Sequence, residues 1–254
     1  MTISGPRMFA RFAYPPNQLG YCGPDDSRAL LEQLDDDRAD PFLRDTARRF
    51  EGAWPYLGLI AASNRIADPL EPRVVEAYWI GNSLLDAVGP AALGDSLEER
   101  FRRVAGPRWA QLVAAVPAQV RPHHNFHVFG VYPWVGLVRS GVVDQPLRVL
   151  DRCRIRWGTV QAVYGDCAVV SSRPLEWDGR ALALGLARPE QVLLRVDGHG
   201  LAPDVHDGDR IAMHWDWACG RLSARQQDEL ARRTRVTLDV VNGLPRPAPA
   251  ALLG

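Results

Sequence analysis

The stretch over residues 153–222 limits the fold more strongly than any other part of the chain. Apolar runs of strand length, such as 159–163 and 168–171, are separated by the turn pair Gly165-Asp166. A pair of this kind between two alternating runs is typical of a β-hairpin. Further apolar runs follow over 181–186, 192–196 and 210–215. About five short strands at this spacing predict a small closed β-barrel.

Two side chains that can bind a metal lie at the ends of this predicted barrel. Cys153 stands just before the first strand, and His214 stands at the end of the last one. Because a small barrel can bring the ends of its strands together, we expect a thiolate and an imidazole to face one site. No cysteine pair has C-x-x-C spacing. Cys167 and Cys219 are predicted to pack in the interior, and Cys22 is either a structural or a reactive thiol.

The same stretch resembles the HypC/HupF family of NiFe-hydrogenase assembly chaperones, which are small β-barrels of the OB type. The matching pieces are Cys153, Gly158-Thr159-Val160, Gly165-Asp166-Cys167-Ala168-Val169-Val170, Gly208-Asp209-Arg210-Ile211-Ala212-Met213-His214 and Trp217-Ala218, followed by a predicted helix over 223–234. The match covers roughly the last 100 residues, about the size of one domain, and says nothing about the first 145.

The resemblance implies a role for the two conspicuous side chains. The family cysteine ligates an iron that carries cyanide and carbonyl groups, and the histidine lies nearby, so these roles pass to Cys153 and His214 as a hypothesis. The implied partner is the hydrogenase large subunit or another maturation protein. In the family, however, the cysteine is the processed N-terminus, whereas here a whole domain precedes it. Trp157 and Asp216 also replace the usual proline and glycine, so the contact with a partner would differ.

The first part of the chain has helical rather than strand patterns. Asp40-Pro41 is a cap followed by a first-turn proline, and Pro72 opens a run with apolar residues at three- and four-residue spacing. About six or seven such segments predict an α-helical bundle. We therefore expect an α+β protein of two domains, with the bundle over 1–145 and the barrel with a C-terminal helix over 146–254.

A histidine cluster, His123, His124 and His127, stands out in the predicted bundle. On one helix, His123 and His127 would share a face, and imidazoles so placed can bind one metal ion. The zinc-protease signature is absent, because no glutamate stands between them. The alternative is a helix start at which the imidazoles cap or bind backbone groups. The cluster is also the best candidate to complete, within one chain, an iron site begun by Cys153 and His214.

Two carboxylates, Glu51 and Glu76, lie among aromatic and apolar residues. A buried carboxylate is costly unless it is paired or bound to metal. Together with the histidines, these glutamates could form a metal site inside the bundle, although the paired Glu-x-x-His motifs of di-iron bundles are missing. Pairing with nearby arginines is the alternative interpretation.

Composition excludes several classes of function. The 30 basic and 30 acidic residues cancel, so no global field favours nucleic acid or an anionic membrane. No apolar run reaches the roughly 20 residues that span a bilayer, and the first residues lack a signal core, so we expect a cytoplasmic protein. Phosphate loops, dinucleotide fingerprints and serine-hydrolase elbows are also missing from the sequence.

Taken whole, the chain also resembles an uncharacterised bacterial family with the strings Tyr-Cys-Gly-Pro and His-Trp-Asp-Trp, which adds no activity. Three hypotheses about function stay open. The first is a maturation factor that binds or delivers an iron fragment or chaperones the hydrogenase large subunit. The second is a metal-dependent enzyme of the helical domain that uses the histidines and glutamates. The third is a metal-free protein-interaction module. An assembly factor is favoured over an enzyme.

Overall fold

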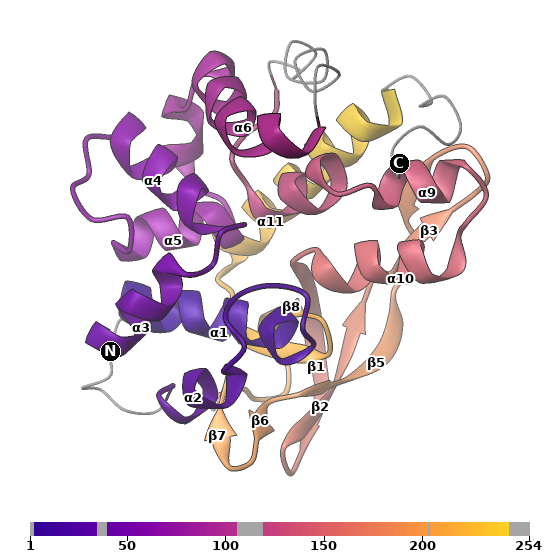
Figure 1. Cartoon of the computed structure of the whole chain (residues 1–254). Helices are drawn as coiled ribbons and strands as arrows, with labels where there is room; N and C mark the ends of the chain where they lie inside the picture. The colour runs from indigo at the N-terminus through magenta and orange to yellow at the C-terminus, as the bar shows by residue number, and fades with distance from the viewer. Residues whose placement is uncertain (1–2, 35–39, 106–118, 203, 244–254) are drawn as a thin grey trace.

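The computed structural model describes residues 3–34, 40–105, 119–202 and 204–243. The chain is of the mixed α+β class, with helices first, strands next and a long helix, α11 (Ala224–Gly243), at the end (Figure 1). This order confirms the predicted class and the predicted placement of a helical part before a sheet and a C-terminal helix.

The helical part begins with a side-chain cap. Ser4 precedes α1 (Gly5–Gln18), and its hydroxyl accepts a hydrogen bond from the Arg7 amide at 3.4 Å, which satisfies one of the free N–H groups of the first turn. Two predicted starts are confirmed, one in α3 (Asp40–Arg48) and one at Pro72 in α5 (Pro72–Trp79). The other helical elements are α2 (Ser27–Glu32), α4 (Trp54–Ser63), η1 (Ser83–Ala87), α6 (Pro90–Ala105), α8 (His124–Phe126), the π-helix η2 (His127–Val131), α9 (Trp134–Arg139) and α10 (Asp144–Cys153).

Five strands pair in the closed order β1-β2-β5-β9-β8, with β8 pairing back onto β1. They are β1 (Arg156–Tyr164), β2 (Cys167–Ser172), β5 (Arg188–Leu193), β8 (Arg210–His214) and β9 (Trp217–Arg221). Neighbouring strands are antiparallel except β5 and β9, which run parallel. The first hairpin turns at Gly165-Asp166, as the sequence predicts, and the inner residues of β2 alternate with less buried ones.

Three details of the predicted strands are wrong. The run over 192–196, expected as one strand, is divided between β5, which ends at Leu193, and a separate strand, β6 (Arg195–Val196). The run over 181–186 was expected in the barrel, but β4 (Leu182–Leu184) pairs with β3 (Leu175–Trp177) in a separate two-stranded sheet. The run over 210–215 was expected to be the last strand, yet β9 follows it after a tight turn. Trp215 makes this turn with φ of 53°, a left-handed conformation that a bulky side chain rarely adopts. A second small hairpin joins β6 and β7 (His199–Gly200).

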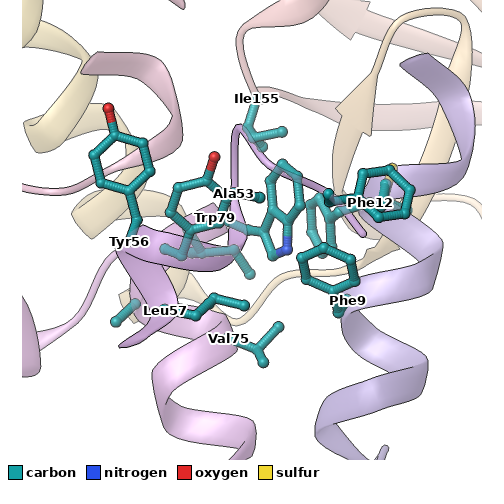
Figure 2. Packing of buried hydrophobic residues seen from close by; sticks show 14 of the residues in the cluster. Phe9, Phe12, Ala53, Tyr56, Leu57, Val75, Trp79 and Ile155 are labelled. Carbon is teal, nitrogen blue, oxygen red and sulfur yellow. The ribbon is translucent and has the colours of Figure 1, made fainter. Parts of the chain in front are cut away.

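Helices and barrel share the largest hydrophobic cluster, while a second cluster that includes Val160, Val170 and Met213 lies within the barrel region alone. Figure 2 shows Trp79 of α5 beside Phe9 and Phe12 of α1, with Ile155 close by, and the same buried cluster contains Trp215 and other barrel residues. The ring centroids of Phe12 and Trp79 are 5.4 Å apart in a stacked arrangement. The predicted domain boundary between residues 145 and 146 falls within α10. The division into two domains therefore stays a prediction: one hydrophobic cluster spans both parts, and another is confined to the barrel region.

Candidate metal centre

The fold brings His124, Cys153 and His214 together from three separate elements. His124 begins α8, Cys153 is the last residue of α10, and His214 is the last residue of β8. One potential ligand atom from each side chain lies within 4.8 Å of the others. The sequence predicts that Cys153 and His214 face one site and that the histidine cluster supplies a further ligand. Of that cluster, His124 occupies this position.

His214 has the geometry of a metal-ligating histidine. Its side chain is fully buried, and its Nδ1 lies 2.6 Å from the backbone oxygen of Phe12. Because a carbonyl oxygen only accepts, Nδ1 carries the proton and Nε2 keeps its lone pair. Nε2 is buried and has no hydrogen-bond partner of good geometry among the described residues, although the Cys153 backbone oxygen is near enough to oppose the lowering of the pKa of His214. A buried polar atom without a partner is costly, and a bound cation would satisfy it.

His124 is held by two hydrogen bonds. Its Nδ1 lies 3.2 Å from the hydroxyl of Tyr78, and its Nε2 lies 2.8 Å from the backbone oxygen of Cys153. Nε2 therefore donates to the carbonyl, and Nδ1 accepts from Tyr78. Metal binding through Nε2 requires the other tautomer, in which Nδ1–H donates to the Tyr78 hydroxyl. The Cys153 carbonyl then competes directly with a metal ion for this imidazole.

The three side chains are neutral at neutral pH. Burial lowers the pKa of His124 to about 4, although the Cys153 carbonyl opposes this shift. Burial also lowers the pKa of His214 far below its usual value, and the neighbouring His124 adds to the effect. Burial raises the pKa of the Cys153 thiol, the nearby Cys22 raises it further, and the Trp215 side chain partly opposes both. Binding of a cation would therefore displace one proton, from Cys153.

The donor set fits a transition-metal ion. Two imidazole nitrogens and one thiolate suit zinc, iron or copper, whereas magnesium and calcium prefer oxygen ligands. Around a tetrahedral ion, such donor atoms are about 3.4–3.8 Å apart, given metal–ligand bonds of about 2.0–2.3 Å. The donors here lie within 4.8 Å of one another, so a contraction of up to about 1.4 Å would bring them to these separations. Three protein ligands leave a fourth position.

Aromatic rings enclose the centre. The Trp79 ring centroid lies 4.6 Å from that of His124 and 5.8 Å from that of His214, and the two imidazoles meet edge to face at 4.9 Å. Trp215, the residue that follows His214, stacks on Tyr21 with the ring centroids 4.5 Å apart. These rings exclude water and lower the local dielectric constant, which strengthens electrostatic interactions between a cation and its ligands.

The other two histidines of the cluster do not form the expected shared helix face. His123 precedes α8 in an extended conformation, and its Nδ1 accepts a hydrogen bond from the Asn125 amide at 3.1 Å. His127 begins the π-helix η2, where its Nδ1 lies 3.2 Å from the Tyr56 hydroxyl. The shared face was predicted from a continuous α-helix, which is not present here. The alternative interpretation, capping of a helix start, describes His123.

The two glutamates lie outside the centre. Glu51 is exposed in the turn between α3 and α4, which corrects the expectation that its surroundings are apolar. Glu76 is half-buried in α5. It accepts hydrogen bonds from the amide groups of Asn82, at 3.1 Å, and Gln226, at 2.8 Å. The partners of Glu76 are thus side-chain amides and not the arginines expected from the sequence.

Comparison with known proteins gives a family and no function. A family model described as a family of unknown function, DUF6390, matches residues 1–247. No curated protein and no solved structure matches the chain. None of the helices in the described parts of the chain is long and apolar enough to cross a membrane. The match agrees with the expected likeness to an uncharacterised family and leaves the HypC/HupF resemblance a hypothesis. The chain belongs to the DUF6390 family.

Proposed function

We propose that this protein holds one transition-metal ion between His124, Cys153 and His214 and acts as an accessory factor in NiFe-hydrogenase assembly. The observation that carries the proposal is the meeting of Cys153 and His214 beside one buried point. The HypC/HupF resemblance assigns the metal to this same pair, and the pair lies far apart in the sequence. In this proposal the cargo is iron, as a fragment with cyanide and carbonyl groups, and the protein works in the cytoplasm.

The strand order supports the OB-type, HypC-like part of the proposal. In chain order, the five barrel strands are β1, β2, β5, β8 and β9, and in space the last two exchange places. The third and fifth of them run parallel. A five-stranded Greek-key barrel of this kind is the plan of the OB fold. In such a barrel the chain end before β1 and the end of β8 meet because β1 and β8 are neighbours.

The helical part completes the site within the same chain. His124 comes from α8 and lies beside Cys153, whose carbonyl oxygen it binds at 2.8 Å. An isolated Cys–His pair leaves an iron ion under-coordinated, and imidazole is a ligand that borderline metals accept. In the proposed assembly role, the helical part thus supplies a ligand that a partner protein would otherwise provide. The hydrogenase large subunit or another maturation protein receives the iron.

The decisive experiment is metal analysis of protein purified without an affinity tag, together with infrared spectroscopy. Bound iron with cyanide and carbonyl stretching bands is the expected result. The Cys153→Ala variant should lose this iron and keep its fold, because a methyl group cannot replace a thiolate ligand. Cys167→Ala, which changes a half-buried cysteine in β2, is the matched control and should keep it. Metal without these bands would support a metal-dependent enzyme, and the absence of any metal would support a metal-free interaction module.

A further inference from the structure

A second cysteine, Cys22, lies in the loop after α1, and a neighbouring residue of this loop packs against the residue that follows His214. Asn17, at the end of α1, donates hydrogen bonds from its side-chain amide to the backbone oxygens of Cys22, at 2.8 Å, and Pro24, at 2.6 Å. Gly23 has φ of 85°, and a Cβ at this position would lie 2.4 Å from the Phe50 ring. The loop therefore has a defined conformation that depends on glycine at this point.

Two contacts, both made by Trp215, connect this loop with the segments that carry Cys153 and His214. The Tyr21 ring stacks on Trp215, the residue after His214, at 4.5 Å. The Trp215 amide donates a hydrogen bond to the backbone oxygen of Arg152, the residue before Cys153, at 2.7 Å. The segments that carry Cys22, Cys153 and His214 thus meet at Trp215. Burial raises the pKa of the Tyr132 hydroxyl to about 12, and both thiols are near enough to contribute to this shift.

We propose that Cys22 is the fourth ligand of the metal centre. The inference rests on the metal site of the proposed function and adds a fourth protein ligand for an ion that does not yet carry cyanide or carbonyl groups. Two thiolates and two imidazoles form a complete tetrahedral set for such a bare zinc-like or iron ion. Cys22 lies outside the group whose donor atoms are within 4.8 Å of one another, so its loop must move inward on binding. Each thiol that binds the ion gives its proton to the solvent, so that two metal–sulfur bonds form and two protons leave.

The position of Cys22 also suggests how the ion enters. His124 and His214 are buried, whereas Cys22 is only partly covered and stands next to Tyr21, whose ring is exposed. A ligand at the outer side of a buried centre is the first to meet an incoming ion and the last to release it. For a protein that delivers its metal, such a ligand sets the rates of uptake and release.

Cobalt substitution tests the number of thiolates directly. Co²⁺ bound to thiolates gives a charge-transfer absorption in the near ultraviolet whose intensity rises with each sulfur ligand. We expect the Co²⁺-saturated Cys22→Ser variant to show about half the wild-type intensity per bound ion, in proportion to one sulfur in place of two. Cys22→Ala should behave alike, which separates loss of sulfur from ligation by the serine oxygen. Cys167→Ser is the matched control and should keep full intensity.

The possible outcomes separate this inference from the proposed function. Equal intensity in wild type and both Cys22 variants would overturn the inference and leave a three-ligand centre. Failure of the wild-type protein to bind Co²⁺ would overturn the proposed function and the inference with it. Thermal unfolding of each metal-free variant should match the wild type, and intensity should be compared only for folded protein, so a misfolded loop is not mistaken for a lost ligand.

Discussion

The Nδ1 atom of His214 donates a hydrogen bond to the backbone oxygen of Phe12, which is 202 residues away in the sequence, at 2.6 Å. This bond ties the first helix to the end of β8. It fixes the tautomer of His214 and turns the Nε2 lone pair toward the interior, where a ligand of a metal ion must point. The first helix therefore contributes to the centre through a backbone atom, without supplying a ligand.

The first prediction concerns coupling between His124 and Cys153. If both bind one ion, His124→Ala and Cys153→Ala should each weaken metal binding strongly, and the double variant should lose much less than the sum of the two effects. The measurement is metal affinity by chelator competition in a double-mutant cycle. His127→Ala is the control, because His127 binds the Tyr56 hydroxyl and lies outside the ligand group. Additive losses would indicate two separate sites.

A second prediction concerns Trp79, which packs between the helical core and the two imidazoles. Trp79→Ala should lower the free energy of unfolding by about 3–5 kcal/mol, since a large buried aromatic leaves a cavity. Trp79→Phe should cost less because more of the volume is kept. Trp54→Ala is the matched control: Trp54 is only partly buried and has Arg48 over its ring at 5.9 Å. Urea unfolding measures all three, and equal costs at both tryptophans would contradict the central position of Trp79.

A third prediction concerns Glu190 of β5, which joins two arginines that flank the metal centre. Its carboxylate accepts hydrogen bonds from Arg156, from Ser172 and from Arg152, the last at 2.6 Å. Burial would raise the pKa of Glu190, but the arginines and Ser172 outweigh it and lower this pKa to about 2. Because the folded pKa is below the unfolded value, the stabilisation is fully present above about pH 4.5 and is lost as the pH falls toward 2.

Substitution of the Glu190 carboxylate should likewise lower the free energy of unfolding at neutral pH. Glu190→Gln leaves the buried Arg156 without its counter-charge, so at neutral pH it should cost about 3–5 kcal/mol of unfolding free energy. The difference from wild type should shrink as the solution is acidified through the window between pH 4.5 and 2. Glu32→Gln, which removes an exposed pair with Arg28, should change stability by less than about 1 kcal/mol at every pH. A pH-independent difference at Glu190 would contradict the linkage.

The sequence predicts the barrel well where a local signal exists. The turn pair Gly165-Asp166 forms the expected hairpin between β1 and β2, and the pair Gly208-Asp209 precedes β8 as expected. The strand β9 has no such signal. The turn before β9 is made by Trp215 in a left-handed conformation. Tryptophan is not a residue from which such a turn is predicted. The conformation is stabilised by packing of the Trp215 ring against Tyr21 and the core.

The candidate site is predictable in part for the same reason. Cys153 and His214 stand at strand ends, and strand ends meet in a small barrel, so their proximity follows from the fold. The sequence does not show which member of the histidine cluster lies beside them, because this depends on the helix type after α8. His127 begins a π-helix, a rare form that the spacing of apolar residues does not predict. The loop with Cys22 is placed by Asn17 and Tyr21 through tertiary contacts, which no local pattern contains.

The last prediction concerns the pH dependence of metal binding. Burial lowers the pKa of His124 to about 4 and that of His214 well below its usual value, so both imidazoles are already neutral near pH 7 and release no proton. Burial raises the pKa of Cys153, and it raises the pKa of Cys22 to about 12, so each thiol must lose a proton to bind. Affinity should therefore rise as the pH rises, by about tenfold per pH unit for each thiolate ligand.

The change of metal affinity with pH gives the number of thiols that lose a proton when the ion binds. With Cys22 and Cys153 both bound, the dissociation constant for Zn²⁺ should fall about a hundredfold per pH unit near neutral pH, and in Cys22→Ser it should fall about tenfold. Chelator competition at several pH values, corrected for protonation of the chelator, gives this slope, and Cys167→Ser should keep the wild-type value. A slope near zero would mean that no thiol binds the ion. A wild-type slope of one proton, unchanged in Cys22→Ser, would leave Cys153 as the single sulfur ligand.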